Sequence, residues 1–438
     1  KATTGKVTAT VDGAKANILV SQLKNANAKD DLDITVLTDA NGTSAKDLIA
    51  LTKKTALIVD ASAITTDGIV GSVADINAVI KAKADAKLVL DAAVAYSVTG
   101  TITAAQANAI ADATNGVVTA TVAADTAAKL VAALDDVAGG LDVLTLKVNG
   151  ATAAALDLIA LNGKTAGKIT VDAKEITGIA ADVTTVLTDI GNDFIGEDKV
   201  AVEITNTVAA NLVDAIANKT SGVVTATITA AEAAALNLAL DDKTVGQKTV
   251  NAYTLKVSDT LGGAAAKDLK ELDAKTSVVV DAKAVTAIKG SAADIKTVLA
   301  AKTITTAANV AANVDGVISA ADANTIAKAT DGVVKATVAT GTAAALNKAL
   351  VDAKATDALS LTVTGGAGTT AAASDLLALD AKTALAITLP ATAAISGTAA
   401  EIKKVYASKG ITTANDEVIT VTDPASAADV NQSCRAFW

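Results

Sequence analysis

The feature that most constrains the fold of this chain is a segment that recurs about every 110 residues. Gly116-Val-Val-Thr-Ala-Thr returns as Gly222-Val-Val-Thr-Ala-Thr and as Gly332-Val-Val-Lys-Ala-Thr, and Gly5-Lys-Val-Thr-Ala-Thr begins the series. These glycines lie 111, 106 and 110 residues apart. A second marker, a glycine four residues before an acidic residue, has a similar period. Its members are Gly71, Gly178, Gly290 and Gly397. A fixed period predicts stacked repeats, so the chain divides into four large repeats that start near residues 5, 116, 222 and 332.

Each large repeat divides further into about four strand–helix repeats. In the second large repeat, Val, Ile, Leu and Thr alternate with period two in four stretches, which predicts half-buried strands. These stretches are residues 117–122, 143–148, 168–173 and 200–205. Between them, apolar residues recur every three or four positions over residues 126–134 and 180–187, which predicts helices. Ser or Thr just before Ala-Ala-Asp or Ala-Ala-Glu is a suitable N-cap for such a helix.

This alternation predicts an α/β fold. A strand, a helix and a return to the next strand favour parallel pairing with right-handed crossovers. Aromatic residues make up 1% of the chain and Met is absent, so the interior has to be built from Ala, Val, Ile and Leu. Small residues of this kind suit thin layers that repeat many times. We expect a solenoid of about 16 strand–helix repeats with a continuous parallel sheet over residues 1–431, followed by an aberrant C-terminal tail at residues 432–438.

Composition argues against several classes of function. The net charge is −10 and Arg435 is the single arginine, which excludes a basic groove for nucleic acid. No apolar stretch approaches the roughly 20 residues that a membrane-spanning helix needs. The sequence has no histidine, so Ser-His and Cys-His catalysis and histidine metal sites are excluded. Cys434 is the single cysteine, so an internal disulfide is excluded, and no base stands beside it in the sequence.

Few residues remain as candidates for chemistry. Gly365-Gly-Ala-Gly368 lacks the Lys and Ser/Thr of a phosphate-binding loop, and Asp39-Ala-Asn-Gly42 lacks the later acidic ligands of a calcium loop. Adjacent acids could in principle serve a glycosidase, although acids at turns are usually solvated. These pairs are Asp30/Asp31, Asp135/Asp136 and Asp241/Asp242. The sequence therefore predicts no enzyme and no cofactor, and structural calcium at the repeat turns stays as an open alternative.

The two ends of the chain resemble two parts of one repeat. Ser426-Ala-Ala-Asp-Val-Asn431 matches the segment that begins at Ser319, and Lys1-Ala-Thr-Thr-Gly5 matches Lys328-Ala-Thr-Asp-Gly332. An uncapped solenoid end exposes strand edges. Either the chain is cut from a longer array, or the end of one copy docks head-to-tail on the start of the next. In the second case, aromatic residues of the tail would fill a pocket of the neighbour. The candidate docking residues are Lys1, Ala2, Thr3, Gly5, Val7, Ser426, Ala427, Val430, Asn431, Phe437 and Trp438.

Several short motifs carry a resemblance to a known class of proteins. They are Ile395-Ser-Gly-Thr-Ala-Ala-Glu-Ile, Val405-Tyr-Ala-Ser-Lys-Gly-Ile411, Glu417-Val-Ile-Thr-Val-Thr-Asp423, Leu272-Asp-Ala-Lys-Thr276 and Val280-Asp-Ala282. In these motifs the chain resembles the Ala/Thr/Val-rich tandem repeats of large secreted or cell-surface proteins of marine bacteria, notably picocyanobacteria. The resemblance covers nearly the whole chain except the tail. It implies an extracellular or cell-surface location and a structural role, and it supplies no catalytic residues.

These observations lead to one expected function and one alternative. We expect an extracellular structural protein, a subunit or segment of a surface filament or fibre that assembles head-to-tail through its terminal half-repeats. The expected partner is a second copy of the chain or the neighbouring repeats of a longer one, with no nucleic acid and no membrane span. The alternative is an adhesin stalk or a phage-fibre-like binding module that recognises a cell-surface receptor or glycan.

Overall fold

The computed structural model describes residues 4–135, 142–189, 193–196, 199–240, 250–364, 369–391, 393–414, 416–424 and 426. This part of the chain is an α/β protein of short helices and parallel strands, as the alternation predicted. It forms two compact lobes, each of which is described by itself. The first lobe comprises Lys1–Asn206, Ala215–Ala226 and Lys243–Thr249, and the second comprises Thr207–Asp214, Thr227–Asp242 and Val250–Trp438.

Helices occur at regular intervals in both lobes. Those of the first lobe are α1 (Ala16–Gln22), α2 (Ala45–Leu51), α3 (Val73–Ala84), α4 (Ala104–Ala111), α5 (Ala127–Ala133), α6 (Ala155–Asn162) and α7 (Ala180–Thr188). Those of the second are α9 (Ala233–Ala239), α10 (Ala266–Ala274), α11 (Ala292–Ala300), α12 (Ala320–Ala329), α13 (Ala343–Ala349), α14 (Ala373–Asp380) and α15 (Ala399–Ala407). Residues of α8 (Ala210–Ala217) are divided between the lobes.

Strands precede and follow these helices. Those of the first lobe are β1 (Thr8–Ala14), β2 (Asp31–Val36), β3 (Thr43–Ser44), β4 (Val59–Ala61), β5 (Ile69–Ser72), β6 (Leu88–Leu90), β7 (Tyr96–Ile102), β8 (Val118–Val122), β9 (Val143–Val148), β10 (Thr152–Ala154), β11 (Ile169–Val171), β12 (Glu175–Gly178) and β13 (Phe194–Ile195). Residues of β14 (Ala201–Val208) and β15 (Val224–Ile228) are divided between the lobes. Those of the second lobe are β16 (Ala252–Thr254), β17 (Ala264–Ala265), β18 (Val280–Ala282), β19 (Ala287–Gly290), β20 (Ile304–Thr306), β21 (Ala311–Ile318), β22 (Val334–Val338), β23 (Ala358–Ser360), β24 (Thr370–Ala372), β25 (Ile387–Thr388), β26 (Ala394–Gly397), β27 (Ile411–Thr412) and β28 (Val418–Val421).

The strands form where the period-two pattern placed them. The four strands predicted in the second large repeat correspond to β8, β9, β11 and β14, and the two predicted helices to α5 and α7. In β8 the side chains of Val118, Ala120 and Val122 are buried, whereas Thr119 and Thr121 are exposed. One face of each such strand therefore contributes to the core and the other faces solvent.

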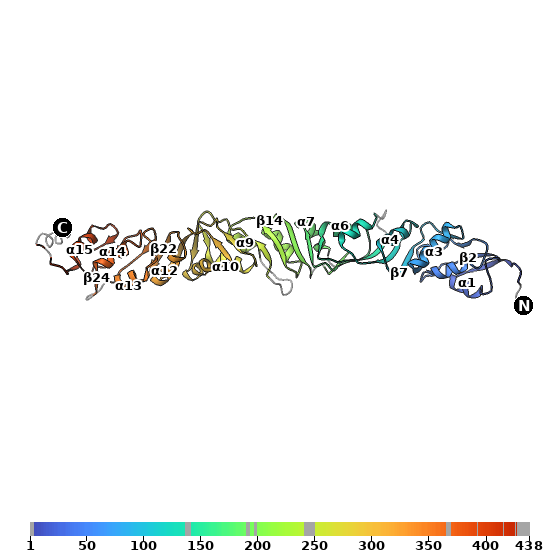
Figure 1. Cartoon of the computed structure of the whole chain (residues 1–438), viewed down its shortest axis with the longest axis horizontal. Coiled ribbons are helices and arrows are strands. Elements are labelled where there is room, and N and C mark those ends of the chain that lie inside the picture. The colour runs from blue at the N-terminus through green and yellow to red at the C-terminus, as the bar shows by residue number, and fades with distance from the viewer. Residues whose placement is uncertain are drawn as a thin grey trace. The chain divides into compact units, whose positions relative to one another are not determined.

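The helices bury one narrow stripe of side chains, because neighbouring residues of a helix point in different directions. In α3, for example, Ile76, Val79 and Ala82 are buried. Helices that follow one another within a lobe pack together, as α2 does against α3 and α10 against α11. Figure 1 shows these successive helices beside the strands in each lobe.

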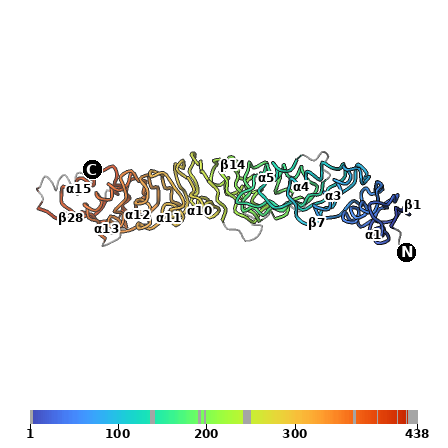
Figure 2. The backbone as a smooth tube through the Cα atoms, turned by 45° about the vertical axis from the view of Figure 1, so that its right-hand side comes forward, coloured from blue at the N-terminus to red at the C-terminus, as the bar shows by residue number. Residues whose placement is uncertain are grey.

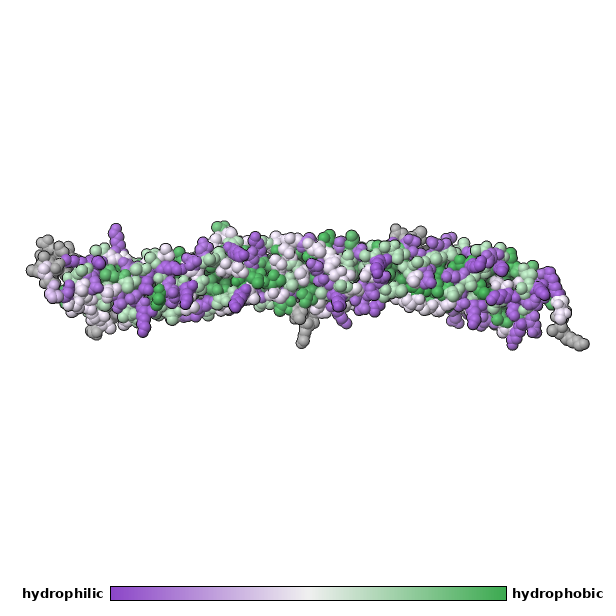
Figure 3. Space-filling model, in the orientation of Figure 1, coloured by the Kyte–Doolittle hydropathy of each residue, from purple (hydrophilic) through white to green (hydrophobic). Residues whose placement is uncertain are grey.

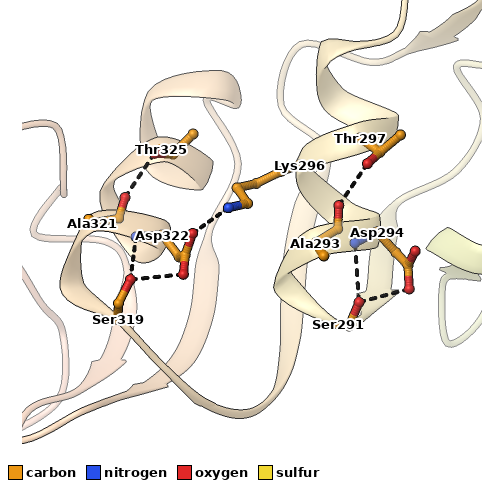
Figure 4. Close-up of polar contacts among 9 residues, drawn as sticks. All are labelled: Ser291, Ala293, Asp294, Lys296, Thr297, Ser319, Ala321, Asp322 and Thr325. Atoms are coloured by element: carbon orange, nitrogen blue, oxygen red, sulfur yellow. Dashed lines mark hydrogen bonds and ion pairs between the residues drawn. The ribbon is translucent and has the colours of Figure 1, made fainter.

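Side chains at the helix starts link neighbouring helices in the second lobe (Figure 4). Ser291 and Ser319 are N-caps, as predicted, whose hydroxyls accept hydrogen bonds from the amides of Asp294 (3.1 Å) and Asp322 (3.0 Å). Each hydroxyl also donates to the carboxylate of the same aspartate. Lys296 of α11 reaches across to Asp322 of α12 and forms an ion pair with it. The same aspartates thus stabilise the start of their own helix and its contact with the preceding one.

The strands belong to several separate sheets rather than to one continuous sheet. Most strand–helix repeats contain two strand segments, and some of these, such as β3 and β10, were not predicted. β2 and β3 are separated by a turn. Gly42 lies in that turn with φ +85°, a conformation that favours glycine. The sheets of the first lobe have the orders β1-β2-β4-β6, β3-β5-β7-β8-β9-β11-β13 and β10-β12-β14. Those of the second have the orders β17-β19-β21-β22-β23, β24-β26-β28, β18-β20 and β25-β27.

One kind of strand joins two series of strands into a longer sheet. In the first lobe, β3, β5 and β7 come just before a helix, whereas β9, β11 and β13 come just after one. β8 is the single strand between α4 and α5, and it pairs with β7 on one edge and with β9 on the other. In the second lobe β22 does the same between β21 and β23. We call β8 and β22 linking strands. They follow the recurring Gly-Val-Val motif.

Candidate docking edges

The contact made by a linking strand has the same geometry in both lobes. Tyr96 of β7 lies opposite Val118, and Ala312 of β21 lies opposite Val334. The Tyr96 amide donates to the carbonyl of Val117 (3.0 Å), and the Ala312 amide donates to the carbonyl of Val333 (2.9 Å). In both pairs the register shifts further along, at an irregularity in the longer strand. The recurring motif is therefore a place where one repeat binds the repeat before it.

Glycine is required in the motif because the preceding repeat comes very close. A Cβ atom on Gly116 would lie 2.3 Å from the carbonyl oxygen of Ala93, and one on Gly332 would lie 2.4 Å from that of Val310. Two residues before each glycine, the hydroxyl of a threonine forms a hydrogen bond with the preceding repeat. The hydroxyl of Thr330 donates to the carbonyl of Val310 (2.5 Å) and accepts from the amide of Gly332 (3.0 Å). Thr114 and Thr220 make the corresponding bonds to Val94 and Val200.

A buried aspartate bonds to the start of each linking strand from the opposite side. The carboxylate of Asp142 accepts from the amide of Val118 (2.8 Å), and that of Asp357 accepts from the amide of Val334 (2.9 Å). Burial raises the pKa of Asp142 above its usual value. Each linking strand is therefore bonded along both edges, as a buried strand requires.

β1 is built like a linking strand, but it pairs along one edge only among the described residues. Val7 corresponds to Val118 and Val334 in the motif, and its amide donates to the buried carboxylate of Asp30 (3.0 Å). Hydrogen bonds from the amides of Asn27 and Val7 lower the pKa of Asp30. β1 then pairs with β2, with Thr8 opposite Asp31, and it is the last strand of its sheet. Figure 2 places it beside the N-terminus at the end of the first lobe.

The missing neighbour leaves the apolar side of β1 exposed. Val7 is 40% exposed, whereas Val118 and Val334 are both 0% exposed. Ala9 is exposed too, whereas its counterparts Ala120 and Ala336 are buried. These side chains need a covering repeat to be buried, and nothing in the described residues supplies one.

β28, in the second lobe, corresponds to the strands that pair with linking strands. It pairs with β26, with Ile419 opposite Ile395, just as β7 pairs with β5 and β21 with β19. Ile419 thus corresponds to Tyr96 and Ala312, which are buried, but Ile419 itself is partly exposed. β28 is the last strand of its sheet, and Figure 2 labels it at the end of the second lobe. Its outer edge is of the kind that binds a linking strand.

Polar contacts fix the position of β28. Asp423, just after the strand, accepts from the amide of Ala399 at the start of α15 (2.9 Å). Glu417, just before it, is buried and accepts from the amide of Ala414 and from the hydroxyl of Tyr406. Burial and the neighbouring Glu417 carboxylate raise the pKa of Tyr406. These bonds hold the strand in place although its outer edge has no partner among the described residues.

A depression of about 400 Å³ lies next to β1, at the end of the first lobe. Val7, Leu23 and Leu32 supply apolar lining, and Gln22 and Asn25 at the end of α1 supply polar side chains. Asp30 also faces it. The depression therefore combines apolar side chains with polar groups at a helix C-terminus, where backbone carbonyls lack helical partners.

The structure places three of the predicted docking residues. Gly5 and Val7 lie at the exposed end of the first lobe, and Ser426 follows β28 in the second. The others lie outside the described residues. They are Lys1, Ala2, Thr3, Ala427, Val430, Asn431, Phe437 and Trp438. Sequence reasoning missed Thr8, Thr10, Ile419 and Thr420 on the two strand edges, although the match between residues 5–11 and 116–122 could have identified the first two.

The residues considered for chemistry have structural contacts where they are described. Asp30 binds backbone amides and Asp31 forms an ion pair with Lys6. Asp39 binds Lys15 and the amide of Asn41, which lowers its pKa. Asp135 accepts a hydrogen bond from Asn108. The remaining candidates lie outside the described residues. These are Asp136, Asp241, Asp242, Gly365, Gly366, Ala367, Gly368 and Cys434.

Two other kinds of site were considered, a metal site and a membrane-spanning helix, and neither occurs among the described residues. Within the described ranges, no group of three or more His, Cys, Asp or Glu side chains is arranged to hold a metal ion. None of the described helices has the length and apolar character needed to cross a bilayer. Figure 3 shows hydrophilic and hydrophobic residues intermingled over the visible face of each lobe.

No protein-family model matches the sequence, and no curated protein or solved structure is significantly similar to it. The two strand edges therefore have to be interpreted from their own geometry.

Proposed function

We propose that this chain is an extracellular structural protein whose copies assemble head-to-tail into a surface filament or fibre. Its strand–helix repeats would stack as one solenoid within each copy, and β1 of one copy would pair with β28 of the next. No catalysis is part of this proposal. The resemblance to secreted repeat proteins of marine bacteria supports the location and the structural role.

One observation carries the proposal. β1 is built like a linking strand but has no strand on its outer edge among the described residues, and β28 is a strand of the type that binds linking strands. The chain contains its own examples of the joint, in β7–β8 and in β21–β22. Exposed edges of this kind readily pair with another chain. Because the two edges differ, the contact is heterologous and can repeat without closing.

The internal examples fix the expected register. Ile419 would lie opposite Val7 and Thr420 opposite Thr8, as Tyr96 lies opposite Val118 and Ser97 opposite Thr119. The Ile419 amide would donate to the carbonyl of Lys6, which corresponds to Val117. Val7 and Ala9 would then lose their exposure to solvent.

A proline substitution at the free edge tests this proposal. The amide and carbonyl of Val7 bond to Asp30 and Asp31, so the peptide groups of Thr8 face the opposite, outer edge. Thr8→Pro removes an outward N–H without removing a bond to β2. We expect Thr8→Pro to abolish concentration-dependent association in sedimentation velocity while leaving the thermal unfolding of the monomer unchanged.

The matched control is Thr119→Pro, at the corresponding position of β8. It removes an internal ladder bond and leaves its acceptor unpaired, which should lower the free energy of unfolding by about 2 kcal/mol. Electron microscopy of the wild-type chain should show filaments that Thr8→Pro lacks. A wild-type chain that stays monomeric at every concentration would contradict the proposal and favour the alternative, a binding module.

A further inference from the structure

We propose that the depression beside β1 binds residues 426–432 of a second copy, with Asn431 bonded to the C-terminal end of α1. This inference rests on the proposed head-to-tail assembly and specifies a second contact in it. The depression is lined by Gln22, Leu23 and Asn25 at the end of α1, together with Val7 and Leu32.

Internal repeats show what covers the corresponding surface. In the first lobe, Asn108 of α4 reaches the end of α5, where its side-chain amide donates to the carbonyl of Ala133 (2.7 Å). The amide of Asp135 donates back to the Asn108 side-chain oxygen (3.3 Å). One asparagine thus supplies a donor to a carbonyl of the last helical turn and an acceptor to an amide just after the helix.

The second lobe repeats this contact between α12 and α13. The amide of Asp352 donates to the side-chain oxygen of Asn324 (2.6 Å), and the Asn324 side-chain amide donates to the Asp352 carboxylate (2.9 Å). Asn108 and Asn324 each lie five residues after the N-cap of their helix, at Thr103 and Ser319. In the helix that precedes a linking strand, the fifth residue after the N-cap therefore contacts the next repeat.

The occupant follows from the sequence after β28. Ser426-Ala-Ala-Asp-Val-Asn431 is identical to Ser319-Ala-Ala-Asp-Ala-Asn324 at five of six positions, and Asn431 lies five residues after Ser426. The end of α1 corresponds to the ends of α5 and α13, since each helix follows a linking strand or β1. Pairing of β28 with β1 of the next copy would bring this segment over the depression, where Gln22 and Asn25 occupy the places of Ala133 and Asp352.

Two singly blocked chains allow the contact to be measured as a defined dimer. Thr8→Pro blocks the β1 edge of one chain, and Ile419→Pro blocks the β28 edge of the other by removing the amide that corresponds to those of Tyr96 and Ala312. Neither chain can polymerise, but a mixture can form a 1:1 dimer through the two intact ends. Its dissociation constant can be measured by sedimentation equilibrium or titration calorimetry.

Asn431→Ala in the Thr8→Pro chain should weaken the dimer about tenfold, as expected for loss of hydrogen bonds at an interface. Asn324→Ala in the same chain is the matched control, and it should lower the stability of the monomer but leave the dissociation constant unchanged. A dimer of unchanged affinity with Asn431→Ala would overturn this inference and leave the strand pairing intact. Absence of any dimer, with a monomeric wild type, would overturn both.

Discussion

β22 and β1 begin with nearly the same sequence but lie in different surroundings. Val334 is the first residue of β22 and Val7 directly precedes β1, and the amide of each binds a buried aspartate, Asp357 for Val334 and Asp30 for Val7. β22 is enclosed by β21 and β23, and Val334 is fully buried, whereas β1 has only β2 beside it in the described structure and Val7 is exposed. The difference shows that burial here is supplied by the preceding repeat and not by the motif. The motif at β1 has the features of a buried contact, but only one half of that contact is present among the described residues.

The first prediction concerns the glycine of the motif and has the largest expected effect. Gly332→Ala places a Cβ atom 2.4 Å from backbone carbonyl oxygens of Asn309 and Val310, which cannot move as a flexible side chain could. We expect it to lower the free energy of unfolding by about 3 kcal/mol, measured by urea denaturation. Gly5→Ala should lower it by less than about 1 kcal/mol, because no preceding repeat lies against Gly5 among the described residues, and should impair assembly instead. Equal losses of stability for Gly332→Ala and Gly5→Ala would contradict the view that contact with the preceding repeat is what requires glycine.

The second prediction compares the two valines. Val334→Ala leaves a cavity in a fully buried position and should cost about 2 kcal/mol. Val7→Ala removes a side chain that is already 40% exposed, so it should cost about 0.5 kcal/mol in the monomer. In the assembled state the cost at Val7 should approach that at Val334, which would appear as a weaker association. Thermal unfolding below and above the association concentration distinguishes the two contributions.

The third prediction concerns the bridges between helices of the second lobe. Lys296 and Asp322 are each about one-third exposed (35%), so their ion pair is partly screened by solvent. Lys296→Ala should cost about 0.5 kcal/mol at low salt, and less in 1 M NaCl because salt screens the charges. Lys348→Ala is a suitable reference for loss of a surface lysine, because Lys348 of α13 forms no ion pair with the described residues. A salt-independent cost would argue that packing of the lysine stem is responsible.

The fourth prediction uses pH and has the smallest expected effect. The folded-state pKa of Asp30 is lowered, so its stabilising contribution is present above the unfolded value of 3.8 and is lost as pH falls through the folded value. The folded-state pKa of Asp142 is raised by burial, so acidification through that raised value relieves an unfavourable charge. Hydrogen exchange, corrected for intrinsic rates, should show β1–β2 losing protection on acidification while β8–β9 does not.

Asn substitutions provide the control for the pH experiment. Asp30→Asn and Asp142→Asn each remove the titrating group, so the opposite pH responses of the two strand pairs should disappear. The same direction of change in both strand pairs would show that the open end does not alter the role of the aspartate.

Much of the fold follows from periodicity in the sequence. The strands at 117–122 and 143–148 and the helix at 126–134 agree with β8, β9 and α5, because alternation of period two or of three to four residues directly reflects which side chains face the core. The short second strands, such as β3 and β10, could not be predicted. Two or three residues carry too little alternation to be recognised, and their pairing partners lie more than 20 residues away.

The candidate docking edges were predictable only in part. Gly5 and Val7 could be chosen because they repeat an internal motif, but the sequence does not state which edge of a strand lacks a neighbour. Which strand edge lacks a neighbour depends on hydrogen bonds between segments that are distant in the chain. The strand pairing in the structure identified Thr8 and Ile419, and the packing around β1 identified the depression beside it.

The amino-acid sequence by itself determined that the chain is a tandem repeat of strands and helices with a core of small aliphatic residues. Local periodicity is enough for this, since each side chain's direction follows from its neighbours in the chain. Only the tertiary structure decided how the strands divide among separate sheets and that a linking strand joins two series of them. These features depend on which backbone groups find partners across the turns, and such pairing is settled when the repeats pack together.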